Sequence, residues 1–228
     1  MKWTHPVILI ATAALLGGCA DKEKDAVPRH PSALPNGADV AFEQSREPDL
    51  NANTHFAAGQ LAESQQRFPE AIIQYRQALE LDPKHLPALY RLAMVHTRLG
   101  QHDQALDTWQ RYIRVTDDKA TGYSNLGYAC EIADRREDAE RAYRQAIAID
   151  PQNQPARVNY GLMLARRGDF PSATEHLSAV LTPAQVHYNL GSVHELQKRP
   201  TEARLEYRRA LELDPTLTAA RKRLAALD

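Results

Sequence analysis

The chain has 228 residues, and its 28 lysines and arginines nearly balance its 29 aspartates and glutamates, for a formal net charge of -1. This length leaves room for one compact domain or one repeat array, and 43% apolar with 25% charged residues excludes wholesale disorder. The near-zero charge argues against nucleic-acid binding, which needs a surplus of cations, and two cysteines are too few for a disulfide framework.

Residues 1–18 have the pattern of a secretory signal peptide: Lys2 is followed by an apolar stretch from Pro6 to Leu16 and then by small residues. The sequence Leu16-Gly17-Gly18-Cys19 resembles the lipobox of bacterial lipoproteins. The resemblance implies acylation of Cys19, anchoring through its lipid, and a place in the outer membrane facing the periplasm, because Ala20 rather than aspartate follows the cysteine. An ordinary cleaved signal with a chance cysteine is the alternative.

Residues 19–50 are predicted to form a lipidated N-terminus and a disordered tether. The segment is polar and is interrupted by Pro28, Pro31, Pro35 and Pro48, with no helical or strand periodicity. A flexible coil of this length has a root-mean-square reach on the order of 30 Å. We therefore expect the folded part of the protein to lie away from the bilayer.

The remainder of the chain repeats itself, mostly with a step of 34 residues. Small residues recur at one position of the repeat: Gly59, Ala93, Gly127, Gly161 and Gly191. Alanine recurs at a second position: Ala71, Ala105, Ala139, Ala173 and Ala203. Large, mostly aromatic residues recur at a third: Tyr75, Trp109, Tyr143, Leu177 and Tyr207. Because independent columns share one step, the chain is predicted to contain a structural repeat.

The period and the order of small residue, alanine, aromatic, alanine and proline resemble the tetratricopeptide repeat. The resemblance implies an all-α solenoid of about five helix-turn-helix units in a domain spanning 51–228. The implied units are residues 52–85, 86–119, 120–153, 154–183 and 184–217, followed by a C-terminal capping helix over 218–228.

Within each unit, apolar residues recur at helical spacing in two blocks, which predicts two amphipathic helices. Gly100 and Gly168 mark the turn between the blocks in two units. Gln66, Asp134 and Lys198 stand in the glycine position of the other three, so the same tight turn is not assured there.

By resemblance, the first helix of each unit lines a concave groove that holds a protein or peptide partner. The implied groove residues are Phe56, Gln60, Tyr90, Arg91, Met94, Asn125, Tyr128, Asn159, Leu162, Tyr188, Asn189 and Ser192. Three asparagines in one column could satisfy the backbone of an extended peptide while tyrosines pack its side chains. Alternatively, these asparagines are consensus residues that bond within the array.

The fourth unit is shorter than the others by four residues, close to one helical turn. Its second helix is predicted to stop near Leu181, with Thr182 as the N-cap and Pro183 as the first residue of the next helix. The deletion either changes the local pitch and creates a specificity site or reflects tolerance of chance deletions.

The sequence contains no recognisable catalytic constellation. His194-Glu195 begins like a zinc-protease helix, but Lys198 occupies the place of the second histidine. The internal positions of His187, His194 and Cys130 favour packed histidines and an inert thiol over metal ligands or a nucleophile. We expect no enzymatic activity, no cofactor, no metal and no small-molecule substrate.

These features predict a non-catalytic scaffold anchored in the envelope. The combination of lipobox, tether and repeats resembles the lipoproteins of tight-adherence (Flp) and type IV pilus assembly, which implies assembly of a pilus or secretion complex. An adaptor lipoprotein for a cell-wall hydrolase or protease is the alternative.

Overall fold

The computed structural model describes residues 50–227, and all regular structure in that range is α-helix. The predicted signal peptide, Cys19 and nearly all of the predicted tether lie outside the described residues. The helices are α1 (Ala52–Ser64), α2 (Phe68–Leu81), α3 (Leu86–Arg98), α4 (His102–Val115), α5 (Lys119–Ile132), α6 (Arg136–Ile149), α7 (Gln154–Arg166), α8 (Phe170–Ser178), α9 (Pro183–Leu196), α10 (Pro200–Leu213) and α11 (Thr218–Ala225).

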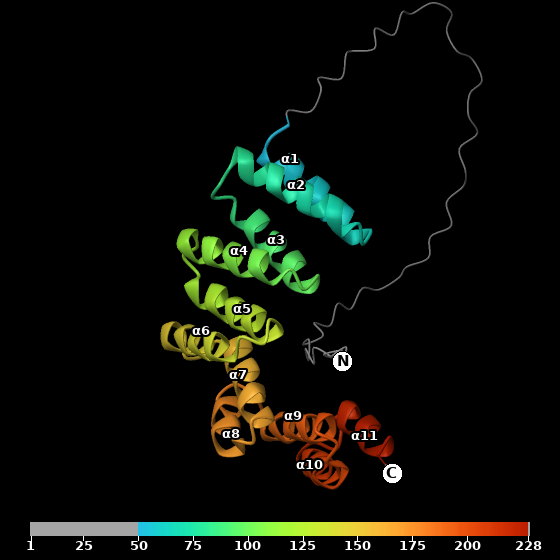
Figure 1. The fold of residues 1–228 in the computed structure, drawn as a ribbon. Helices are drawn as coiled ribbons and strands as arrows, with labels where there is room; N and C mark the ends of the chain where they lie inside the picture. Colours follow the sequence, from blue (N-terminus) through green and yellow to red (C-terminus); the bar gives the residue numbers. More distant parts are fainter. Residues whose placement is uncertain (1–49, 228) are drawn as a thin grey trace, which may run out of the picture. The chain divides into compact units, whose positions relative to one another are not determined.

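Consecutive helices form five antiparallel pairs, from α1 with α2 to α9 with α10 (Figure 1). Each predicted unit contains one of these pairs. The second helix of each pair also contacts the first helix of the next pair, and α11 contacts α10 in the same way. Each helix pair therefore buries its apolar faces mainly against its immediate neighbours, as expected for a helical solenoid.

The turns inside the pairs share one backbone conformation, whether or not they contain glycine. Gln66, Asp134 and Lys198 have φ angles of 60°, 56° and 59°, in the left-handed region that Gly100 and Gly168 also adopt. In each turn, the amide after this residue bonds back to a carbonyl near the end of the first helix. The sequence left open whether the three turns without glycine would have the same tight geometry. They do have it, because the hydrogen bonds at the helix ends hold these residues in the left-handed conformation.

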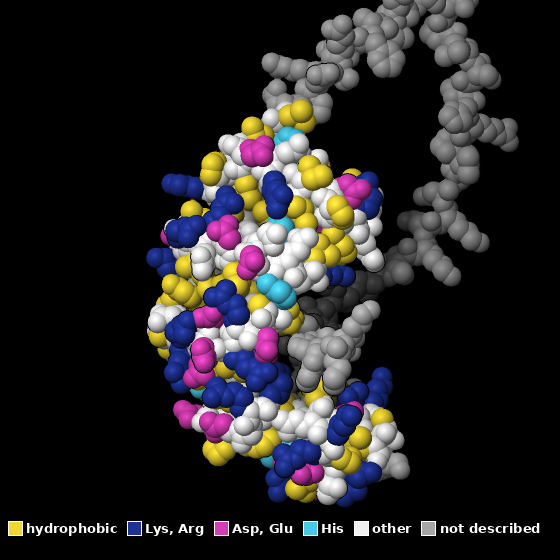
Figure 2. All heavy atoms as spheres, viewed as in Figure 1, with side chains coloured by type: hydrophobic (Ala, Val, Ile, Leu, Met, Phe, Trp, Pro, Cys, Tyr) yellow, Lys and Arg dark blue, Asp and Glu magenta, His cyan; other side chains and the backbone are white. Residues whose placement is uncertain are grey.

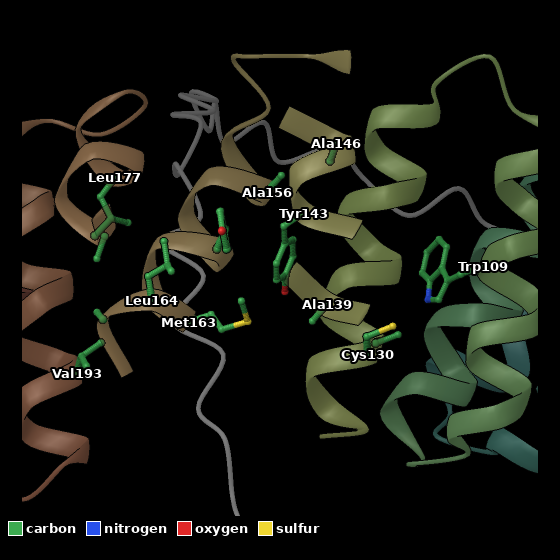
Figure 3. Packing of buried hydrophobic residues seen from close by; sticks show 14 of the residues in the cluster. Trp109, Cys130, Ala139, Tyr143, Ala146, Ala156, Met163, Leu164, Leu177 and Val193 are labelled. Atoms are coloured by element: carbon green, nitrogen blue, oxygen red, sulfur yellow. The ribbon is translucent and has the colours of Figure 1, made fainter. Parts of the chain in front are cut away.

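The small-residue column marks the closest approach of paired helices. A Cβ atom on Gly127 would lie 2.6 Å from the Tyr143 ring, so only hydrogen fits there. Tyr143 is fully buried, and the apolar core continues from Trp109 on α4 to Val193 on α9 (Figure 3). Repeated small-large pairing thus sets the spacing within the units and extends this core from the second unit to the fifth, while the first unit and α3 share a separate buried cluster.

The fourth unit differs from the others in its second helix. α8 has 9 residues, whereas α2, α4, α6 and α10 each have 14. It ends at Ser178, three residues before the predicted end near Leu181. Thr182 caps α9 through a hydrogen bond from the Gln185 amide, and Pro183 is the first residue of that helix, as predicted.

The surface of the described residues carries charges of both signs. Lysine and arginine side chains alternate with aspartate and glutamate over the face shown in Figure 2. Within residues 50–227, no helix combines the length and apolar character needed to cross a bilayer.

Candidate functional site

The structure places all twelve predicted groove residues on the first helices of their units, α1, α3, α5, α7 and α9. Gln60 and Met94 are exposed. Seven more are half-buried: Phe56, Tyr90, Arg91, Asn125, Tyr128, Asn159 and Leu162. We call these nine residues the first-helix surface.

The other three predicted groove residues belong to α9 and are buried. Tyr188, Asn189 and Ser192 are 7%, 3% and 3% exposed. Ser192 Oγ donates to the Tyr188 carbonyl and lies 3.2 Å from the Tyr207 hydroxyl oxygen. The expectation that these three side chains line an open groove is therefore corrected, because they pack inside the last unit.

Two aromatic members of the first-helix surface, Tyr90 and Phe56, rest on residues of the second helices. The Tyr90 ring meets Trp109 edge-on at a centroid distance of 5.4 Å and Tyr112 at 5.9 Å. Phe56 lies 5.9 Å from Tyr75. Edge-to-face packing favours one ring orientation, so Tyr90 is held in place by its neighbours.

The asparagines of the predicted column use part of their hydrogen-bonding capacity within their own helices. Asn125 Nδ2 donates to the Thr121 carbonyl over 3.0 Å, and Asn189 Nδ2 donates to the Gln185 carbonyl over 2.8 Å. The alternative of bonding within the array therefore holds for these amide nitrogens. The side-chain oxygen of half-buried Asn125 is an acceptor that a partner's backbone amide could use.

Arg91 is fixed by a carboxylate from the preceding unit. Its Nε and Nη2 each lie 3.0 Å from an oxygen of Glu63, and the Tyr75 hydroxyl donates to the same carboxylate over 2.7 Å. The side chain of Arg91 is 39% exposed and that of Glu63 is 14% exposed. A bidentate pair with a third hydrogen bond orients the guanidinium, and Arg91 presents the more accessible charge.

The same arrangement recurs in the third and fifth units. Glu131 accepts from the Tyr143 hydroxyl over 3.1 Å and pairs with Arg166. Glu195 accepts from the Tyr207 hydroxyl over 2.8 Å and pairs with Arg223 on α11. We call the three clusters the Tyr-Glu-Arg triads. Each joins the two helices of one unit to a first helix or the cap that follows.

The second and fourth units lack the triad. In the second unit, Trp109 Nε1 donates to Thr97 Oγ1 over 3.3 Å, at the positions that tyrosine and glutamate occupy elsewhere. In the fourth unit, Leu177 and Ala165 fill these positions and are buried. Sequence reasoning missed the structural role that Glu63, Glu131 and Glu195 share. Their constant separation of 12 residues from a tyrosine was the signal in the sequence.

The triad tyrosines are protected from ionisation. Burial, together with the hydrogen bond to Glu63, raises the pKa of Tyr75 to about 12. Burial likewise raises the pKa of Tyr207 to about 12, with Glu195 acting in the same direction. The pKa of Tyr143 is also raised, mainly by burial. The hydroxyls therefore remain donors to the carboxylates at neutral pH.

A cleft of about 510 Å³ lies between α6, α7 and α8, and none of its lining residues was predicted as a site residue from the sequence. Tyr160 accepts a 3.0 Å hydrogen bond from Arg144 Nε there and donates to Glu140, which also pairs with Arg167. Both arginines thus share the single carboxylate of Glu140. With Asp169 and Glu175, the lining carries three carboxylates and two guanidinium groups.

The titratable groups show no sign of a reactive centre among the described residues. Burial lowers the pKa of His96, His176 and His194, so these imidazoles are neutral at pH 7. Burial raises the pKa of the Cys130 thiol to about 11, which disfavours the thiolate. His187 is half-buried and bonds to Glu206 instead of packing in the core. Within residues 50–227, no group of three potential metal ligands comes together.

Sequence models described as tetratricopeptide repeat match residues 52–85 and 184–217, residues 85–152 and residues 133–185. Together they cover residues 52–217 without a gap, the same range in which the structure shows five stacked helix pairs. The chain belongs to the tetratricopeptide repeat family. Proteins with tetratricopeptide repeats generally mediate protein-protein interaction and are typically non-enzymatic scaffolds.

Among curated proteins, the small glutamine-rich tetratricopeptide repeat-containing protein 2 of Mycosarcoma maydis is 31% identical over 98 residues. The match covers 43% of this chain and 28% of that protein. This chain therefore spans less than a third of the length of this relative.

Two solved structures share the repeat fold. The crystal structure of MamA is 22% identical, with a TM-score of 0.58 over 72% of this chain and 92% of that one. YrrB, described as a TPR protein with an unusual peptide-binding site, is 21% identical, with a TM-score of 0.53 over 76% of this chain and 91% of that one. At these identities the likeness concerns the fold of the repeats.

Proposed function

We propose that this tetratricopeptide repeat protein is a non-catalytic scaffold that holds a segment of a partner protein against the first-helix surface. The observation that carries the proposal is a set of accessible apolar, aromatic and amide side chains on the adjacent first helices α3 and α5: Tyr90, Met94, Asn125 and Tyr128. Aromatic residues and methionine are enriched at protein interfaces, and amides can pair with a peptide backbone. Arg91 adds one oriented cation.

The partner surface is narrower than the sequence suggests. Because Tyr188, Asn189 and Ser192 are buried, the proposed contacts concentrate on α1, α3, α5 and α7. Tyr90 is supported by Trp109 and Arg91 by Glu63, so both are positioned before a partner arrives. Such preorganisation reduces the conformational entropy lost on binding.

The experiment is crosslinking in intact cells followed by identification of the captured proteins. The test variant combines Met94→Ala, Asn125→Ala and Asn159→Ala on the first helices. The matched control combines Gln110→Ala, Gln145→Ala and Ile149→Ala, which are exposed on α4 and α6. We expect the test variant to capture at least about tenfold less partner than the wild type, as for substitutions at the centre of an interface. The control variant should capture as much partner as the wild type. Equal capture by both variants would disprove binding at the first-helix surface.

We also propose that the protein is an outer-membrane lipoprotein, anchored through Cys19 and facing the periplasm. The support is the sequence Leu16-Gly17-Gly18-Cys19 and the proline-rich stretch that follows it. Cys19→Ser removes the acceptor thiol, and we expect the protein to leave the membrane fraction. Full membrane retention of that variant would contradict anchoring without affecting the binding proposal.

The pathway proposed for this scaffold is assembly of a pilus or secretion complex in the envelope, on the resemblance to repeat lipoproteins of tight-adherence and type IV pilus systems. Capture of pilus or secretion components by the wild type, lost in the first-helix variant, is the expected result. Capture of a folded cell-wall hydrolase or protease instead would replace assembly with the adaptor function.

A further inference from the structure

The first unit exposes a position on α1 that every other unit buries. Leu61 is 57% exposed. The residues at the same position of the later units are 1% to 4% exposed: Val95, Ala129, Met163 and Val193. Each of them lies on a first helix that the second helix of the preceding pair covers. Leu61 belongs to the first helix of the described array.

A second position on the same face shows the same contrast. Ala58 is exposed, whereas the equivalent residues Leu92, Tyr160 and Leu190 are 3% to 7% exposed and Leu126 is half-buried. Ala58 and Leu61 are three residues apart, so they lie on one side of α1. The exposure therefore belongs to a helix face and not to one side chain.

The composition of α1 suits contact with an uncharged surface. The helix contains no lysine or arginine, and its one acid, Glu63, is engaged by Tyr75 and Arg91. Ala57 and Ala58 are small, which permits close approach of another helix, and Leu61 can fill the space beside them. Two such faces brought together would meet no like-charge repulsion.

The opposite end of the array is closed. α11 packs on α10 and buries Ala220 completely, and Arg223 pairs with Glu195. The outward side of α11 carries exposed Arg221 and Lys222. Stacking the α1 face of one copy on the α11 end of another would bury these charges against leucine and alanine, which is unfavourable. Head-to-tail assembly is therefore disfavoured.

We propose that the occupant of the α1 face is the same face of a second copy of this chain. A two-fold axis places the two α1 helices antiparallel, with Leu61 of each copy against the alanine pair of the other. Such an interface uses one patch twice and closes at two copies. The pairing leaves the members of the first-helix surface on α3, α5 and α7 accessible to a partner, and it gives the scaffold two such sites, with α1 shared between the partner and the second copy.

The test is the mass of the full chain, carrying Cys19→Ser so that no lipid is attached, measured by light scattering between about 1 and 100 µM, a range that brackets weak protein dimers. We expect a dimer whose dissociation constant rises at least about tenfold in Leu61→Glu, as for a substitution at an interface centre. The matched control is Ile73→Glu. Ile73 is 53% exposed on α2 of the same unit, at a position where later units carry exposed Asp107, Arg141 and Glu175.

Two further measurements separate loss of pairing from loss of folding. Leu61→Ala removes the side chain without adding a charge, and thermal unfolding shows whether each variant is folded. A wild type that stays monomeric, or a dimer that Leu61→Glu and Leu61→Ala leave intact, overturns the proposal. Slow maleimide labelling of Leu61→Cys in a monomeric sample, compared with that of Ile73→Cys, would also overturn it. Such a result would mean that another part of the same chain covers the α1 face. A copurifying protein on the α1 face of a monomer overturns it as well.

Discussion

The Tyr143 hydroxyl donates a hydrogen bond to Glu131 across 3.1 Å, from the second helix of the third unit to the first. The same carboxylate pairs with Arg166 in the next unit. Because Tyr143 is fully buried, its hydroxyl has no access to bulk water as a substitute partner. The carboxylate thus satisfies a buried donor and joins adjacent units at once.

Removing this carboxylate should destabilise the array more than removing the hydroxyl. Glu131→Ala leaves the buried hydroxyl without its acceptor, and we expect it to lower the free energy of unfolding by about 1–3 kcal/mol. Tyr143→Phe should lower it by about 0.5–1.5 kcal/mol, because Arg166 still pairs with Glu131. Urea unfolding followed by circular dichroism measures both. In the double variant the losses should not add; full additivity would show that the two groups act independently.

The stability of the array should fall in mild acid, in part through His96. Burial, followed by the charge of Arg76, holds the pKa of His96 below 6.5, and the hydrogen bond with Gln101 only partly offsets them. The unfolded state therefore takes up a proton near pH 6.5 that the folded state resists, so stability is present above that pH and is lost below it. We expect the unfolding free energy of His96→Gln to decline less steeply than that of the wild type between pH 7 and 5. Parallel curves would contradict this role for His96.

Alkaline pH should also weaken the fold, through the triad tyrosines. The folded-state pKa values of Tyr75 and Tyr207 are about 12, above the ordinary value of 10.0. Their contribution is complete below pH 10 and is lost as the pH rises toward 12, because the unfolded chain ionises first. Replacing both with phenylalanine should flatten the loss of stability over that range. Tyrosinate absorbance in the native wild type should report delayed ionisation of these two residues, and normal titration would contradict it.

The glycine-free turns offer a stabilising substitution. Lys198 has a φ of 59°, a conformation that is unfavourable for residues with a Cβ atom. Lys198→Gly should raise the free energy of unfolding by about 0.5–1 kcal/mol, the relief of strain exceeding the added entropy of the unfolded chain. Gly168→Ala, at a φ of 88°, should lower it by about 1 kcal/mol or more. Thermal melts measure both, and a fall in the melting temperature of Lys198→Gly would count against this account of the turn.

The fold could be predicted because its determinants repeat along the chain. Small residues such as Gly127 and large ones such as Tyr143 recur at fixed intervals, and each interval corresponds to one contact between paired helices. The start of α9 was predictable from Thr182 and Pro183, since capping is a local interaction. Local and periodic interactions are therefore visible in one sequence.

The partner surface was harder to predict because it depends on contacts across units. The column that contains Asn125 and Asn159 also contains Asn189, yet Asn189 is buried while the other two remain partly accessible. Arg91 and Arg166 occupy different positions in their units but serve equivalent glutamates, so no single interval identifies both. The exposure of Leu61 follows from its place at the start of the described array, which the apolar residues at the same position of the other units do not reveal.

The short α8 has a mechanical consequence. It meets α9 over a smaller interface than any other second helix shares with the first helix that follows. Because neighbouring contacts carry most of the cohesion in a repeat array, the junction at residues 179–182 is where the chain should part first under tension. Pulling from the C-terminus would then release α9, α10 and α11 as one block, leaving the six helices from α1 to α6 and the pair α7 and α8 folded behind it.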